Sequence, residues 1–168
     1  MTAAPDPISM LLAPGATGIG AARQVIHDMQ DAFRKGDYAR MAALYHDDID
    51  WLFHGPTSVF PDVGHRSGKI EVFKTLAALN AMYRFERYVT DQLIAEGDWA
   101  AGIADVTLAQ RTSGRVIHCK IASFHRVRDG QVIEYRGFTD SFDAVEQVIG
   151  HELPLSRITR DGRAPART

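Results

Sequence analysis

The sequence predicts an α+β domain in which helices come first and a mostly antiparallel sheet follows. Residues 21–82 carry apolar side chains at helical spacing, interrupted by one short aromatic strand, whereas residues 83–139 form long β-prone runs separated by turns. Strands of this length twist and curl, and a curled sheet wrapped around helices encloses a conical cavity. We therefore expect a conical barrel, with three N-terminal helices packed in a strongly curved mixed sheet.

The first helix is predicted to begin at Ala21 and to stop at Gly36. Its apolar residues recur at helical spacing with polar residues between them: Val25, Ile26, Met29 and Phe33. Before it, residues 1–20 are rich in proline and glycine with little periodicity, so we expect a flexible N-terminal arm.

A second, short helix is predicted after Asp37, whose side chain can cap it. Met41, Leu44 and Tyr45 share one face of this helix, and the following aspartates, Asp47 and Asp48, end it. A strand from Ile49 to His54 comes next, with Trp51 and Phe53 on one face. Residues 64–68 are then expected to form a turn, followed by a third helix with one apolar side: Ile70, Phe73, Leu76 and Ala77.

Four strands are predicted in the second half, at residues 83–95, 99–111, 115–128 and 131–139. Asp129-Gly130 between β-prone runs is a strong hairpin signal. Asp140 can cap a closing helix that runs to Ile149. Residues 21–150 thus form one domain, and residues 151–168 are expected to be a loosely ordered tail.

Composition excludes several function classes. The formal net charge of −2 provides no field that would gather nucleic acid or an anionic membrane surface. No run approaches the roughly 18 apolar residues of a membrane span. Cys119 is the only cysteine, which suits a reducing compartment, and we expect a cytoplasmic protein.

With these elements placed, the chain resembles the NTF2-like superfamily and, within it, the SnoaL-like branch that includes steroid isomerases, limonene epoxide hydrolase and scytalone dehydratase. The resemblance covers roughly residues 21–150. Four segments carry it: GDYARMAALYHDDIDW (36–51), GHRSG (64–68), RDGQVIEY (128–135) and YRGFTDSFDAVEQ (135–147). It implies a cone-shaped fold, a pocket for a small hydrophobic molecule and a homodimer formed through the outer sheet face.

The resemblance transfers catalytic positions unevenly. The proton-moving carboxylate of steroid isomerases falls on Phe53, and their oxyanion-hole tyrosine falls on Met29. The Arg, first Asp and second Asp of limonene epoxide hydrolase fall on three positions of which one is acidic: Ile103, Asp105 and Gly137. A catalytic histidine of scytalone dehydratases falls close to His118.

Asp105 is the strongest single candidate for chemistry, because it interrupts an apolar strand. Such a carboxylate either sits in a pocket where desolvation raises its pKa, and then serves as a general acid or base, or it pairs across the sheet with a cation on the outer face. His118 is a possible second acid or base, and the alternative is a histidine on the sheet surface. The sequence leaves open which face of the strand 115–128 looks inward, because one bulge reverses it.

Aromatic residues are candidates for the pocket wall, the alternative being plain core. The resemblance places strand-one residues in the pocket, which selects Trp51 and Phe53. The full set of expected substrate-binding residues is Met29, Trp51, Phe53, Phe60 and Tyr135; Tyr83 and Phe138 are further aromatic candidates.

No metal site is expected, because the three histidines of this region lack the spacing of a ligand set: His46, His54 and His65. Three functions remain open. One is a cofactor-free enzyme that isomerises, cyclises, dehydrates or hydrates a hydrophobic substrate, or an epoxide-hydrolase-like hydrolase. The second is a non-catalytic domain for ligand binding or dimerisation. The third, an adaptor for a partner protein, would require an exposed apolar groove on the sheet.

Overall fold

The computed structural model describes residues 20–60 and 62–153, which form four helices and one six-stranded sheet. Residues 1–19 of the expected arm and residues 154–168 of the expected tail lie outside the described residues. The helices are α2 (Ala21–Lys35), α3 (Tyr38–Leu44), α4 (Lys69–Met82) and α5 (Ser141–Ile149). The strands are β1 (Tyr45–His54), β2 (Gly64–Ser67), β3 (Tyr83–Glu96), β4 (Trp99–Gln110), β5 (Val116–Arg128) and β6 (Gln131–Thr139).

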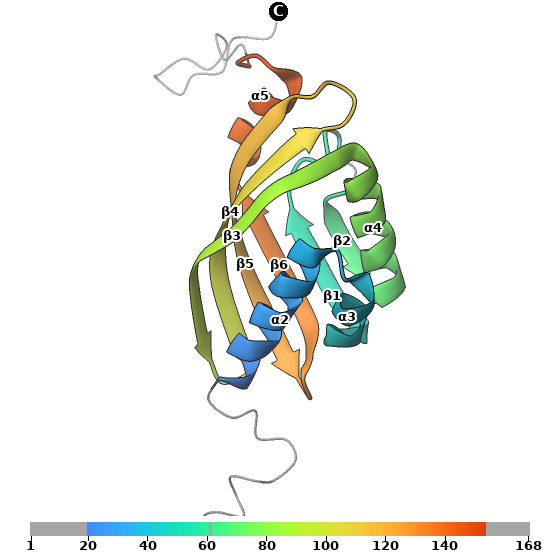
Figure 1. Cartoon of the computed structure of the whole chain (residues 1–168), viewed down its shortest axis with the longest axis vertical. Coiled ribbons are helices and arrows are strands. Elements are labelled where there is room, and N and C mark those ends of the chain that lie inside the picture. Colours follow the sequence, from blue (N-terminus) through green and yellow to red (C-terminus); the bar gives the residue numbers. More distant parts are fainter. Residues whose placement is uncertain (1–19, 61, 154–168) are drawn as a thin grey trace, which may run out of the picture.

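The sheet is mixed, and its strands follow the order β2-β1-β6-β5-β4-β3. Every neighbouring pair is antiparallel except β1 and β6, which run parallel. Strands β3, β4, β5 and β6 form the predicted meander, and the long strands curve around the helices (Figure 1). The expected α+β class and the mixed, curved sheet are confirmed; the sheet curves without closing.

Helix α2 lies across the concave side of the sheet, where it contacts β3, β4 and β5 (Figure 1). It ends as predicted at Gly36, whose φ of 67° is a left-handed conformation that glycine adopts without strain. The Asp37 side chain accepts a hydrogen bond from the Arg40 backbone N–H and so caps α3.

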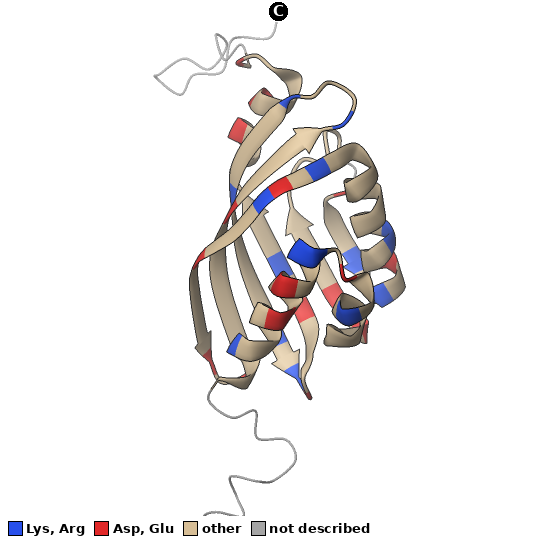
Figure 2. Cartoon of the chain, viewed as in Figure 1, with Lys and Arg blue, Asp and Glu red and all other residues tan. Residues whose placement is uncertain are grey.

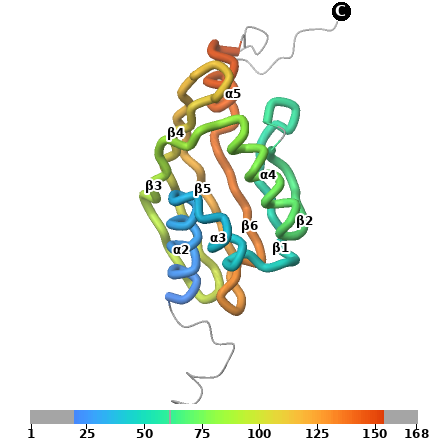
Figure 3. Tube along the Cα trace, turned by 45° about the vertical axis from the view of Figure 1, so that its right-hand side comes forward, coloured from blue at the N-terminus to red at the C-terminus, as the bar shows by residue number. Residues whose placement is uncertain are grey.

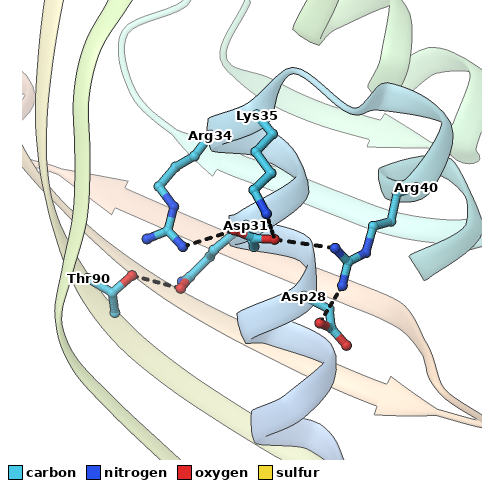
Figure 4. A network of polar contacts seen from close by, with 7 residues as sticks. Asp28, Asp31, Arg34, Lys35, Arg40 and Thr90 are labelled. Carbon is cyan, nitrogen blue, oxygen red and sulfur yellow. Dashed lines mark hydrogen bonds and ion pairs between the residues drawn. The ribbon is translucent and has the colours of Figure 1, made fainter.

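Polar contacts fix α3 against α2 (Figure 4). The Arg40 guanidinium reaches back to Asp28 at 2.6 Å and to Asp31 at 3.3 Å. Asp31 also pairs with Lys35 and Arg34 on its own helix, and these cations hold the pKa of its carboxyl below the usual value. The network orients the two helices whose inner faces reach the cavities described below.

Helix α4 flanks β1 and β2, and α5 packs on β5 at the other end of the sheet, as the turned view shows (Figure 3). The prediction that Ile70 and Ala77 lie on the buried side of α4 is wrong, since both are exposed. Val72 and Thr75 are buried instead. The predicted cap of α5 is confirmed: the Asp140 carboxylate accepts hydrogen bonds from the backbone N–H groups of residues 142 and 143.

Two sequence boundaries are wrong for the same reason. Strand β1 starts at Tyr45, four residues earlier than expected, because Tyr45 pairs with Val132 of β6. Residues 64–67 form strand β2 rather than a turn, because they pair with residues 50–53 of β1. In both places pairing with a distant strand decides the local structure.

Charged residues of both signs occur along α2 and along β3 (Figure 2). Within residues 20–60 and 62–153, no helix is long and apolar enough to cross a membrane.

Candidate active site

Two adjoining cavities lie between the helices and the concave face of the sheet. The first, here called the loop-side cavity, has a volume of about 110 Å³ and lies between α4, α5 and the sheet, where residues 54–56, 60, 62 and 63 also line it. Its walls are mostly apolar: Trp51, Phe53, Phe60, Val63, Leu76, Leu79, Phe85, Leu108, Ile117, Ile121, Ala144 and Val148. Such a concave, apolar space with a few polar groups is typical of small-molecule sites.

The second, here called the α2-side cavity, has a volume of about 100 Å³ and lies beneath α2 and α3. Its polar lining groups are Gln30, Tyr45, Tyr88, His125 and Tyr135. Six residues line both cavities, so the two cavities lie directly next to each other: Trp51, Phe53, Leu76, Leu79, Phe85 and Ile121.

Asp62 is the one Asp, Glu, Lys or Arg among the described residues that line the loop-side cavity. It lies in the segment between β1 and β2, and its Oδ1 atom is buried with no hydrogen-bond partner. Burial raises the pKa of the Asp62 carboxyl, against smaller opposing effects of its own backbone N–H and the Arg66 charge. A carboxylate whose pKa is raised in this way holds a proton more tightly than an ordinary one, which suits a general acid or base.

Tyr83, the first residue of β3, is buried and lines the same cavity. Burial and, second, the negative charge of Asp62 raise the pKa of the Tyr83 phenol, so the hydroxyl stays protonated and can donate a hydrogen bond. Thr75 and Cys119 also reach this cavity. Burial raises the pKa of the Cys119 thiol, which keeps it a neutral group.

The five residues expected to bind substrate all line the cavities. Phe60 lines the loop-side cavity, Met29 and Tyr135 line the α2-side cavity, and Trp51 and Phe53 line both. The Trp51 and Tyr135 rings stack, with centroids 5.3 Å apart and planes 8° apart. Their role in binding a substrate stays a prediction. The further candidate Phe138 lies on the other sheet face, where it is 39% exposed and stacks on His54.

Asp105 lies elsewhere than expected. It pairs with Lys120 of the neighbouring strand at 2.7 Å, and it lines neither cavity. The hydrogen bond and charge of Lys120 lower the pKa of the Asp105 carboxyl. The expectation of a desolvated carboxylate with a raised pKa is therefore wrong at this position, and the alternative, a cross-strand ion pair, holds.

The structure also decides which face of β5 looks inward. Cys119 and Ile121 line the loop-side cavity, whereas His118 points to the face that carries Lys120. The His118 ring hydrogen-bonds the Thr107 hydroxyl at 3.2 Å, and its backbone is held by Gln147 of α5. His118 thus lines neither cavity, and the structure gives it no contact with the space where a substrate would bind.

The three histidines weighed as metal ligands are engaged separately. His46 accepts a hydrogen bond from the Asp48 backbone N–H, His54 stacks on an aromatic ring, and His65 pairs with Asp50 at 2.5 Å. Among the described residues, no group of three or more His, Cys, Asp or Glu side chains converges as a metal site.

Sequence reasoning missed Asp62, although one signal pointed to it. It is the only acidic residue in the segment 55–68, which sits between an aromatic strand and a helix. His125 was missed as well, because a histidine between Phe124 and Arg126 carries no pattern of its own.

Comparison with known proteins gives one family and many structures of the same fold. The family model described as SnoaL-like domain matches residues 26–135. No sequence among the curated proteins matches this chain.

Three solved structures illustrate the structural likeness. An isomerase candidate from Rhodopseudomonas palustris is 27% identical, with a TM-score of 0.70, 78% of this chain covered and 97% of that chain. An NTF2-like protein from Burkholderia pseudomallei is 17% identical, with a TM-score of 0.70 and coverages of 76% and 97%. An LEH-like epoxide hydrolase from M. tuberculosis is 15% identical, with a TM-score of 0.64 and coverages of 77% and 90%.

Proposed function

Because this chain belongs to the SnoaL-like domain family and has the NTF2-like fold, we propose that it is a cofactor-free enzyme that moves a proton on a hydrophobic small molecule, with Asp62 as the proton-transferring carboxylate. The observation that carries this proposal is the buried, unpartnered Oδ1 of Asp62 at the wall of an apolar cavity. A buried carboxylate oxygen without a hydrogen-bond partner costs stability, and carboxylates with a shifted pKa cluster at functional sites.

The chemistry follows from the two polar groups. The Asp62 carboxylate takes a proton from a C–H bond beside a carbonyl, and the electrons of that bond move onto the carbonyl oxygen. The Tyr83 hydroxyl, which lines the same cavity, donates a hydrogen bond to this developing negative charge. The protonated Asp62 then returns the proton, either to another carbon, which isomerises the substrate, or to a hydroxyl that leaves as water.

The walls set the substrate class. Apart from Asp62, the described lining of the loop-side cavity carries no charged carboxylate, lysine or arginine. A substrate with a second full charge would lose its hydration there without gaining a partner. We therefore expect a neutral, mainly apolar substrate with a carbonyl or hydroxyl group. The isomerase name of the Rhodopseudomonas structure agrees with this class of reaction.

A non-catalytic binding domain is the second candidate, and the almost wholly apolar lining of the loop-side cavity favours it. The two candidates differ in one property. A binding domain needs the shape of the cavity, whereas the enzyme also needs the Asp62 carboxylate.

The test uses 5-nitrobenzisoxazole, a neutral aromatic probe that reports on carboxylate bases. A base removes its C3 proton, the N–O bond breaks, and the ring opens to a coloured cyanophenolate, which is the product. We expect the Asp62→Asn variant to lose about a hundredfold or more of the probe rate. The matched control is Asp105→Asn, the same substitution on the outer sheet face, which should keep the wild-type rate.

Binding of the neutral fluorophore 1-N-phenylnaphthylamine, measured beside the rate, separates the two candidates. Retained binding with lost turnover in Asp62→Asn supports the enzyme. Equal probe rates in wild type and Asp62→Asn, with binding intact, would leave only the binding domain.

A further inference from the structure

His125 is a buried imidazole that the proposed proton transfer does not use. It lies on β5, is 1% exposed, and lines the α2-side cavity. Its Nε2 atom is hydrogen-bonded to the Ser123 hydroxyl at 3.0 Å, while its Nδ1 atom is buried and has no hydrogen-bond partner. A buried polar atom without a partner is uncommon in native proteins and calls for an explanation.

The surroundings of His125 are polar but uncharged. Three tyrosines line the same cavity: Tyr45, Tyr88 and Tyr135. Burial raises the pKa of each phenol, to about 12 for Tyr88, where the charge of Arg34 opposes it with a smaller effect. The three phenol groups therefore stay protonated.

No Asp, Glu, Lys or Arg is among the described residues lining this cavity. Burial also lowers the pKa of His125 to about 3, so the ring is neutral. The α2-side cavity thus offers hydrogen-bonding groups to a neutral ligand and no partner for an ion.

We propose that the α2-side cavity is the binding site for a hydroxyl group of the substrate, with His125 Nδ1 as its hydrogen-bonding partner and specificity determinant. This inference rests on the proposed function, because it places one end of the same neutral, apolar substrate. Because six residues line both cavities, the end of the substrate that carries the hydroxyl would lie next to the end that faces Asp62.

A hydroxyl is the group that suits either tautomer of the ring. If Nε2 carries the hydrogen and donates to Ser123, Nδ1 accepts from the ligand; if the Ser123 hydroxyl donates to Nε2, Nδ1 carries the hydrogen and donates to the ligand. A carbonyl fits only the second arrangement. Because the unpartnered nitrogen is already desolvated, a ligand hydroxyl regains a hydrogen bond there, and an apolar analogue does not.

The experiment compares two probes of nearly the same shape, 2-naphthol and 2-methylnaphthalene, by their dissociation constants. The measured quantity is the ratio of the two dissociation constants in each variant. The two probes differ in hydrophobicity by the same amount in every variant, so this difference cancels when the ratios are compared. Two substitutions separate the ring nitrogens: His125→Gln keeps a polar group near Nε2, and His125→Asn keeps one near Nδ1.

We expect His125→Gln to lower the preference for 2-naphthol by about three- to tenfold, the worth of one hydrogen bond. His125→Asn should keep most of the preference, and Asp105→Asn, on the outer sheet face, should leave it unchanged. A ratio that is the same in wild type and His125→Gln overturns the inference, as does an equal loss in His125→Gln and His125→Asn.

A second measurement needs no variant. In ¹⁵N spectra of the wild-type protein, the Nδ1 resonance of His125 should shift when 2-naphthol binds and stay in place when 2-methylnaphthalene binds. An unmoved Nδ1 resonance with 2-naphthol bound contradicts the inference. Failure of the proposed proton transfer is seen separately, as an undiminished rate with 5-nitrobenzisoxazole in Asp62→Asn.

Discussion

Asp62 and Tyr83 line the same cavity, and the charge of the Asp62 carboxylate adds to burial in raising the pKa of the Tyr83 phenol. A potential base and a protonated hydroxyl thus face one apolar space. The two residues come from different elements, the segment before β2 and the start of β3. This pairing gives the cavity both groups that a proton transfer beside a carbonyl needs.

Replacing Asp62 by asparagine should stabilise the protein at neutral pH. The folded-state pKa of Asp62 is raised above the ordinary 3.8. The folded protein therefore holds a buried charge once the pH exceeds this raised, folded-state pKa. Stability is therefore lost as pH rises from about 3.8 through the folded pKa. We expect urea denaturation to show a higher free energy of unfolding for Asp62→Asn at pH 7, and no gain at pH 3.

The comparison variant is Asp105→Asn, which should lower stability at pH 7, because it removes the ion pair with Lys120. A destabilised Asp62→Asn at pH 7 would show that the carboxylate has a partner in solution.

Tyr83→Phe should slow the probe reaction without abolishing binding. The substitution removes only the hydroxyl that would stabilise the negative charge on the probe oxygen. We expect the rate to fall by at most about tenfold relative to wild type. Tyr38→Phe on the exposed side of α3 is the matched control and should keep the full rate. An unchanged rate in Tyr83→Phe would remove this tyrosine from the mechanism.

His125 should make the protein sensitive to acid. Burial lowers its folded-state pKa to about 3, whereas the unfolded chain binds a proton near 6.5. The stability that a neutral His125 provides is complete above pH 6.5 and falls as pH drops toward 3, by about 1.4 kcal/mol per unit for one group. Its facing neighbour Tyr135 stays neutral over this range.

The test compares the free energies of unfolding of wild type and His125→Gln between pH 6.5 and 4.5. The slope of the unfolding free energy against pH should be shallower in the variant, by about 1.4 kcal/mol per pH unit. Parallel slopes would mean that His125 is protonated in the folded protein.

Two aromatic rings pack so closely on Gly137 that they leave no room for a side chain there. A Cβ atom there would lie 2.7 Å from Phe53 Cδ2 and 2.6 Å from the Tyr135 hydroxyl oxygen. Both rings line the α2-side cavity, so Gly137→Ala should cost about 1–3 kcal/mol of stability and weaken probe binding. Thermal unfolding and titration with 1-N-phenylnaphthylamine measure the two effects; wild-type values for both would show that the rings move aside freely.

We also propose that the protein is a homodimer formed through the outer sheet face. Large apolar side chains are exposed there, including Phe124 at 46% and Phe138 at 39%, whose rings pack edge to face. Phe124→Glu should convert the dimer into a monomer in sedimentation velocity. Ile70→Glu, on an exposed position of α4, should leave it dimeric. A monomeric wild type at micromolar concentration would contradict the proposal.

Local patterns in the sequence predicted most of the elements. The caps at Asp37 and Asp140, the stop at Gly36 and the hairpin at Asp129-Gly130 are all confirmed. Each depends on residues close in sequence. Strand β2 depends on pairing with β1, and the early start of β1 depends on Val132, far along the chain, so no pattern within either segment predicted them.

The site was less predictable, because it depends on which way side chains point. A register shift between Arg126 and Val127 lies next to the hairpin and changes the pairing of β5 with β6. The inward face of β5, and with it the outward position of His118, could not be deduced from turn length alone. Asp105 was misjudged for a related reason: its neighbours Ala104 and Val106 are buried on the opposite face, so an apolar setting in sequence was not one in space.

The most direct test of the central proposal is a titration of the Asp62 carboxyl, followed by its ¹³C resonance in the wild-type protein with and without 1-N-phenylnaphthylamine. We predict a pKa above the ordinary 3.8, which rises further when the apolar probe displaces water from the cavity. A pKa at or below 3.8 in both samples would contradict the assignment of Asp62 as the proton-transferring group.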